Sequence, residues 1–179
     1  MSEYGKFIRW RVAIFVMLAF SVWSVYLAGC AAPIVGGVAG IAEKEKRDKW
    51  MPKAKEGNAE AQYRVAESYC CGRGAFYDTD LAIAWYCRAS IQGHTDAQYK
   101  LANVYAGDLS IKSEIRTVGM EFEDPVKAYA WYSVAASHGH SEAMKKKEKW
   151  EGKLNSTQRE EAEQIIKNWE KQQCPAIKE

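Results

Sequence analysis

The sequence has almost no net charge and lacks the residue patterns of common catalytic centres. Its 179 residues include 25 lysines and arginines and 23 acids, giving a formal charge of +2. So small a charge argues against strong electrostatic binding to nucleic acid. Cys-Gly-Arg-Gly at 71–74 fits a turn rather than a phosphate loop, and no Ser-His-Asp or Cys-His order matches a known catalytic pattern. We therefore expect a protein that is not an enzyme and holds no cofactor.

Histidine is also scarce, with three residues in the chain. His138 and His140 form a His-Gly-His pair, and His94 and His140 each follow a glycine in a repeated pattern that places them at helix starts. None of the three has a carboxylate or a cysteine nearby at the spacing of metal ligands. The sequence therefore predicts no metal site.

The first thirty residues are predicted to be a targeting segment. A basic stretch with Lys6, Arg9 and Arg11 precedes an uncharged apolar run over 12–28, as in a secretory signal peptide. The run ends in Leu-Ala-Gly-Cys at 27–30, which resembles the lipobox of bacterial lipoproteins. This resemblance implies that residues 1–29 are removed and that Cys30 is lipidated.

An uncleaved membrane anchor is the alternative, although the apolar run is at the short limit for a span. Both alternatives place the rest of the chain outside the cytoplasm, because the basic flank stays inside. Aspartate after the lipidated cysteine would resemble an inner-membrane retention signal. Ala31 stands there instead and favours the periplasmic face of the outer membrane.

Two further segments precede the main pattern. Residues 30–42 are small and glycine-rich, which predicts a flexible tether. Residues 43–56 are charged and predict a leading helix that is broken near Pro52. Residues 1–29 carry three bases and one acid, so the remaining chain has 22 charges of each sign. The excess positive charge thus belongs to the targeting segment.

One thirteen-residue stretch occurs twice, as GNAEAQYRVAESY from Gly57 and as GHTDAQYKLANVY from Gly93, 36 residues later. A partial third copy begins at Gly139. A second pattern also recurs, with Asp78 and Trp85 in the first unit matched by Asp124 and Trp131 in the next. A period in this range predicts a solenoid, in which each unit buries its apolar face against its neighbours.

These motifs resemble the Sel1-like repeat, an αα-hairpin relative of the tetratricopeptide repeat. The resemblance implies an all-α fold: a short right-handed superhelical array with a capping helix. The repeats would cover 57–92, 93–138 and, in part, 139–154, and residues 155–179 would form the capping helix and a frayed tail. The family also implies protein–protein interaction.

The spacing within the repeats predicts the core and the helix ends. Asp78 and Asp124 are expected to be helix N-caps, with Pro125 at the first helical position. Trp85 and Trp131 are expected in the core. A final helix is predicted over 155–172, with Asn155 and Gln158 as a capping pair. The following residues supply the buried stripes of the first and last helices: Ala61, Val65, Ala66 and Tyr69; Ala162, Ile165, Ile166 and Trp169.

Six residues are the candidates for binding a partner. Superposition on the tetratricopeptide pattern puts them on the concave face of the first helix of each repeat. Tyrosines beside acids there suit a peptide with basic or amide groups. The alternative is that the two tyrosines pack between repeats. The candidates are Glu60, Tyr63 and Glu67 in the first unit and Asp96, Tyr99 and Asn103 in the second.

Two other segments are possible contact regions. An insertion at 107–123 lengthens the second repeat by ten residues and either forms a binding loop or has drifted neutrally. The basic run at 145–149 either is a solvated helix face or meets an anionic polymer of the cell envelope.

Four cysteines besides Cys30 allow three complete pairings. Cys71–Cys87 is disfavoured, because the two would lie about 12 Å apart along the hairpin. Cysteine-rich Sel1-like proteins, some of which bind or hydrolyse β-lactams, pair cysteines across successive helices. Ser90 and Gln98 occupy those positions here, so this part of the resemblance fails.

The sequence therefore favours a membrane-tethered adaptor that binds a protein or peptide partner in the cell envelope. An enzyme, or an enzyme inhibitor, acting on cell-wall or β-lactam substrates is the alternative. A purely structural lipoprotein is a third possibility. The favoured function has no nucleic-acid partner and touches the membrane only through its N-terminal lipid.

Overall fold

The computed structural model describes residues 32–70, 78–108 and 123–177, and the side chains from residue 44 onward. Over these ranges every regular element is a helix. The chain divides into two compact units, Met1–Ile41 and Ala42–Glu179. The second unit contains all the side chains discussed below. Cys30, Cys71 and most of the 107–123 insertion lie outside the described residues.

Helix α2 runs from Ala32 to Lys55 and differs from the prediction at both ends. Residues 32–42 were expected to be a flexible tether but are helical. Extending an existing helix avoids the cost of nucleation, which offsets the poor propensity of the glycines. The helix was expected to break near Pro52 but continues past it to Lys55. The Pro52 carbonyl accepts from the amide of Glu56 at 3.1 Å, and Ala54 is buried in the core at the last turn. No helix in the described ranges is long and apolar enough to cross a membrane.

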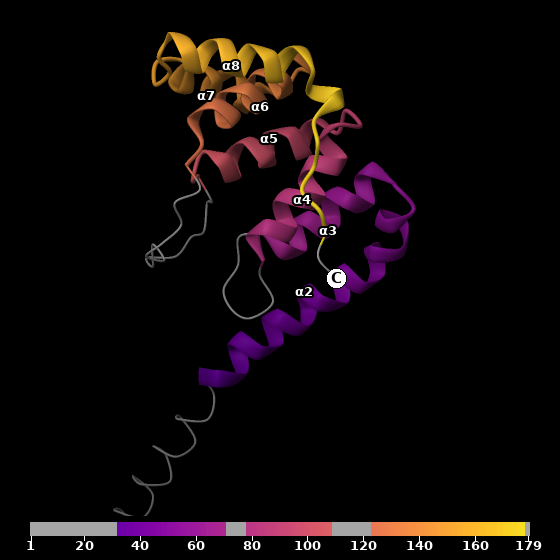
Figure 1. Ribbon diagram of the computed structural model, residues 1–179. Coiled ribbons are helices and arrows are strands. Elements are labelled where there is room, and N and C mark those ends of the chain that lie inside the picture. The colour runs from indigo at the N-terminus through magenta and orange to yellow at the C-terminus, as the bar shows by residue number, and fades with distance from the viewer. Residues whose placement is uncertain (1–31, 71–77, 109–122, 178–179) are drawn as a thin grey trace, which may run out of the picture. The chain divides into compact units, whose positions relative to one another are not determined.

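The repeats form a series of αα-hairpins, as expected (Figure 1). We call the first helix of each unit the A helix and the second the B helix. From α3 to α7, each helix packs on the one before it in the chain. The A helices are α3 (Ala59–Tyr69), α5 (Thr95–Tyr105) and α7 (Ser141–Glu151), and the B helices are α4 (Thr79–Ser90) and α6 (Pro125–Ser137).

Local signals place the helix ends where the sequence predicts them. The carboxylates of Asp78 and Asp124 each accept the amide three residues on at 2.9 Å, and Pro125 begins α6. His94 and His140 are the N-caps of α5 and α7.

The backbone conformation explains why a glycine recurs before each A helix. Gly57, Gly93 and Gly139 precede the three A helices and adopt φ values of 95°, 86° and 87°. This left-handed conformation is unfavourable for residues with a Cβ atom. Glycine at this position therefore lets the chain turn sharply into each A helix.

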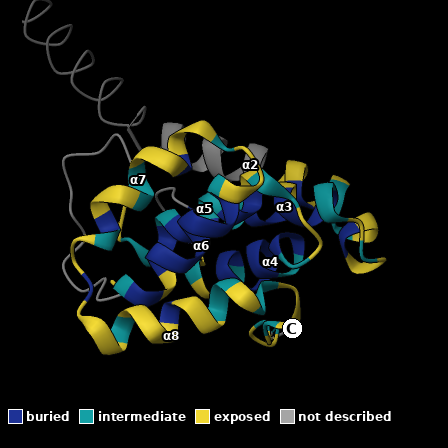
Figure 2. Cartoon of the chain, turned by 90° about the horizontal axis from the view of Figure 1, so that it is seen from above, coloured by how far each residue is buried: buried dark blue, intermediate teal, exposed yellow. Residues whose placement is uncertain are grey.

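Small and aromatic residues share the core, which is shown in dark blue in Figure 2. Ala61, Val65 and Ala66 of α3 are buried, as are Trp85 and Trp131, each with 3% of its surface exposed. These predicted core positions are confirmed, whereas Tyr69, the fourth residue of the predicted stripe, is only partly buried against the core. The many alanines let neighbouring helices approach closely, and the tryptophans fill the space between them.

The C-terminal segment closes the array. Helix α8 (Ser156–Lys167) begins with the predicted capping box of Asn155 and Gln158 and packs on α6. The predicted helix over 155–172 was too long, because Asn168 ends α8 and a short 3-10 helix, η1 (Trp169–Lys171), follows. Ala162 is fully buried, and Ile165, Ile166 and Trp169 are partly buried against the core.

The tail after η1 is held in place, so the prediction that it frays was wrong. Cys174 forms a disulfide with Cys87 of α4. Beside it, the Arg88 guanidinium donates to the carbonyl of Pro175 at 3.0 Å. Ile177 packs against the core. The tail therefore returns across a helix of the first repeat, where a covalent bond restrains it.

Candidate functional site

The exposed sides of the three A helices are aligned by contacts from one repeat to the next. Equivalent positions in the repeated stretch lie at i, i+3, i+4 and i+7 of each A helix and so share one helical face. We call these residues the A-helix face. They are Glu60, Tyr63, Arg64 and Glu67 of α3, Asp96, Tyr99, Lys100 and Asn103 of α5, and Glu142, Lys145, Lys146 and Lys149 of α7.

His94 joins α3 to α5. Its Nδ1 accepts the amide of Ala97 at 3.2 Å as the N-cap of α5. Because Nδ1 is an acceptor, the proton lies on Nε2, which donates to Glu60 Oε2 at 2.8 Å. The ring stacks on Tyr63 with centroids 4.7 Å apart. One side chain thus caps a helix, binds a carboxylate and packs on an aromatic ring.

His140 repeats this arrangement between α5 and α7. Its Nδ1 accepts the amide of Ala143 at 3.2 Å, and its ring stacks on Tyr99 at 4.1 Å. Its Nε2 lies 3.6 Å from the carboxylate of Asp96. Each of these two histidines therefore lies beside a carboxylate. The carboxylates come from the preceding repeat, which sequence spacing alone does not bring close.

These contacts set the electrostatics of α3. The hydrogen bond from His94, with help from Arg64, lowers the pKa of Glu60 against a smaller opposing effect of burial. Burial and the acceptor Glu67 raise the pKa of Tyr63 above its ordinary value. Glu60 is therefore ionised and Tyr63 is neutral near pH 7, so this part of the face presents carboxylates.

The six candidate residues differ in what they offer a partner. Tyr63 is 7% exposed, and its hydroxyl donates to Glu67 at 2.8 Å. Tyr99 is half-buried, and Asn103 accepts the hydroxyl of Tyr132 at 2.7 Å. Both tyrosine rings pack between repeats, the alternative considered for them.

The carboxylates remain more accessible than the rings. The side chain of Asp96 is 64% exposed and that of Glu60 is 46% exposed. Recognition at this face would therefore rely on charges and hydrogen bonds more than on aromatic stacking.

Sequence reasoning missed two buried glutamines. Gln98 is fully buried, donates through Nε2 to the carbonyl of Ser90 at 3.0 Å, and accepts from His138 Nδ1 at 2.8 Å. Gln62 donates to the carbonyl of Ala54 at 3.2 Å and accepts from Gln92 at 2.7 Å. Each glutamine joins the last turn of the helix before its A helix to a residue that follows the next B helix. The recurrence of Gln beside core alanines was the signal available in the sequence.

Replacement of Gln98 with leucine is expected to lower the free energy of unfolding by about 1–3 kcal/mol. Leucine of similar size leaves the Ser90 carbonyl and His138 without their buried partner. Urea denaturation measures the loss. Gln164→Leu, at an exposed position of α8, is the control and should change stability by less than about 0.5 kcal/mol. Equal stability of both variants would show that the buried amide contributes nothing.

The described residues contain no cluster of three or more His, Cys, Asp or Glu side chains that could hold a metal ion. The tyrosines whose pKa values are raised, Tyr63, Tyr86, Tyr105 and Tyr132, owe this first to burial in the helix packing. These shifts reflect packing and do not identify a catalytic group.

A known family model matches the repeat helices described above. The family model of the Sel1 repeat matches residues 59–94 and 95–140, which contain α3 to α6 with their caps. The chain contains two Sel1 repeats. Such repeats generally mediate protein–protein interaction, and their fold is typically a non-catalytic scaffold. A search of curated proteins finds no match to this chain.

A solved structure shows the same fold. It is the crystal structure of a protective antigen present in uropathogenic Escherichia coli strains, which displays an SLR (Sel1-like repeat) fold. The TM-score is 0.57 and the sequence identity is 21%. The match covers 74% of this chain and 29% of the antigen, so the Sel1-repeat chain spans less than a third of that protein's length.

Proposed function

We propose that this Sel1-repeat chain is a lipid-anchored adaptor of the bacterial cell envelope that holds a protein partner on its A-helix face. The lipobox-like ending at Cys30 supports the anchor. The structural observation that carries the location is the Cys87–Cys174 disulfide, since such bonds persist outside the reducing cytoplasm. The periplasmic face of the outer membrane is favoured by Ala31, and the inner membrane with an uncleaved anchor is the alternative.

The proposed binding role rests on the residues that α5 contributes to the A-helix face. Asp96 is highly exposed, and Lys100 is half-buried with no ion pair among the described residues. Tyr99 beside them is held by His140, so the surrounding surface is rigid. A surface whose side chains are already held in place loses little conformational entropy when a partner binds.

Mass spectrometry of the purified protein tests the anchor. The native chain is expected to begin at Cys30 and to carry an acyl group on it. Cys30→Ser should keep residues 1–29 and lack the acyl group, because both processing steps require the thiol. Cys174→Ser, the matched cysteine control, should be acylated like the native chain. A native chain that retains residues 1–29 without acylation would favour the uncleaved anchor.

Capture of partners from the envelope tests the binding face. Asp96→Lys should weaken capture of the partner by about tenfold, because it reverses an exposed charge at the centre of the face. Glu163→Lys makes the same change in charge on α8 and should leave capture unchanged. Circular dichroism checks that both variants are folded. Equal capture by the two variants would place the binding site elsewhere.

A further inference from the structure

The charge of the A-helix face changes sign along the array. On α3, Glu60 and Glu67 share a single cation, Arg64, at 2.6 Å and 3.5 Å. This leaves one negative charge on that part of the face. On α5, Asp96 and Lys100 cancel. The A-helix face is thus acidic on α3 and neutral on α5.

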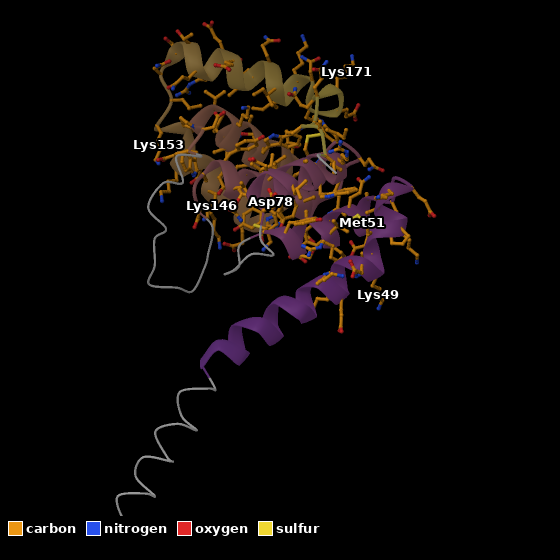
Figure 3. All side chains as sticks on the ribbon, turned by 60° about the horizontal axis from the view of Figure 1, so that its bottom comes forward. Lys49, Met51, Asp78, Lys146, Lys153 and Lys171 are labelled. Atoms are coloured by element: carbon orange, nitrogen blue, oxygen red, sulfur yellow. A yellow bond between two sulfur atoms is a disulfide. The ribbon has the colours of Figure 1, made fainter. Side chains whose placement is uncertain are left out.

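The third A helix is basic at the equivalent positions. One acid, Glu142, stands against three lysines on α7, so the face positions carry a net charge of +2. Lys145 pairs with Glu142 at 2.9 Å, and Lys146, labelled in Figure 3, pairs with Asp108 at the end of α5. Lys149 is exposed and has no ion pair among the described residues. Positive charge therefore remains at this end after the pairs are taken into account.

The charges on the A-helix face contribute to the pKa shifts of neighbouring side chains. Burial, together with the charge of Lys149, lowers the pKa of Lys146. At the other end, the charge of Asp96 adds to burial and to Glu67 in raising the pKa of Tyr63. Contacts of His94 with Glu60 and of His140 with Asp96 join α3 to α5 and α5 to α7, so the faces of the A helices are continuous.

The length of the face matches a short extended segment. Successive A helices pack on the B helices between them and are bridged by the side chains of His94 and His140. If this bridged spacing is about 10 Å, at the upper end for helix packing, the distance from α3 to α7 is about 20 Å. An extended chain covers this distance in about six residues at about 3.3 Å each. One short segment can thus meet both ends of the charge gradient.

We propose that the partner presents an extended segment whose own charges are separated, with basic side chains over α3 and acidic side chains over α7. This inference rests on the proposed binding role of the A-helix face and adds the order of charges on the partner. A segment bound the other way would place lysines beside Lys149 and carboxylates beside Glu67. Such like-charge contacts select one orientation.

Two synthetic peptides of about ten residues and identical composition test the order of charges. One carries lysines in one half and glutamates in the other, and the second alternates them. The full chain in detergent should bind the segregated peptide about tenfold more tightly than the alternating one at low ionic strength, and added salt should remove the difference. Equal binding of the two peptides, or no binding of either, would overturn the proposal.

A charge exchange provides the matched variant. Glu67→Lys combined with Lys149→Glu keeps the net charge of the protein and leaves face charges of +1 on α3 and 0 on α7. Because the charge difference along the face becomes small, the preference for the segregated peptide should fall nearly to that of the alternating one. Glu67→Gln with Lys149→Gln reduces the difference in face charge between α3 and α7 from three to one. It keeps an acceptor for Tyr63, which guards against loss of folding. An unchanged preference in both variants would overturn the inference.

The two proposals can fail separately. If the envelope partner is lost with Asp96→Lys but is captured normally by the charge-exchange variant, the A-helix face binds a partner without reading its charge order. If capture is insensitive to Asp96→Lys, the binding role itself fails.

Discussion

Replacing Trp85 with alanine is expected to lower the free energy of unfolding by about 3–5 kcal/mol. The indole lies in α4 with 3% of its surface exposed and belongs to the core that joins the first repeat to its neighbours. Truncation removes a large buried apolar surface and leaves a cavity that packed helices fill only in part. Urea denaturation followed by circular dichroism gives the change, with the chain lacking residues 1–29 as the sample.

Met144→Ala is the control for this experiment, because Met144 on α7 is 48% exposed. Its removal should change stability by less than about 0.5 kcal/mol. A loss below about 1 kcal/mol for Trp85→Ala would mean that the indole is not part of a cooperative core.

Removing the disulfide by Cys174→Ser is expected to lower the free energy of unfolding by about 2–5 kcal/mol. The bond closes a loop between residues separated by 87 positions, which restricts the unfolded chain. Urea denaturation under oxidising conditions measures the effect, and hydrogen exchange should show that residues 172–177 lose protection. The loss of the bond should affect the tail first, because its other contacts to α4 are few.

The presence of other cysteines limits which control can be used in the disulfide experiment. Cys70 is also disulfide-bonded, so adding a reductant to the native chain breaks more than one bond. The comparison is therefore made between oxidised variants, with Gln173→Ser as an exposed substitution in the same tail. If Cys174→Ser is as stable as Gln173→Ser, the bond does not stabilise the fold.

The two predictions concern different parts of the molecule. Trp85 stabilises each repeat against the next, whereas Cys174 joins the end of the chain to its first repeat. Neither residue belongs to the A-helix face. Both substitutions should therefore change stability without altering the charge order that we propose the partner reads.

Features governed by neighbours in sequence could be predicted. Asp78, Asp124 and Asn155 each accept an amide three residues on, so the cap is visible in the local sequence. The burial of Trp85 and Trp131 follows from their recurrence, because equivalent positions in a repeat meet equivalent surroundings.

Contacts between residues far apart in the sequence could not be predicted in this way. His94 reaches Glu60 from 34 residues away, and which carboxylate it meets depends on how α5 is set against α3. The sequence also left the pairing of Cys174 open. Its bond to Cys87 requires the chain to turn back after η1, and no local pattern encodes that return.

The repeat, most helix starts, the core positions and six residues of the A-helix face could be predicted from the sequence. Only the packed fold shows that Tyr63 and Tyr99 pack against histidines of the next repeat and that the tail is bonded to α4. It also shows that Gln62 and Gln98 bind residues on either side of their repeats. Helix formation and capping depend on interactions over a few residues, which a sequence displays directly. The remaining contacts arise only when helices far apart in the chain come together, and their geometry follows from the packing of the whole array.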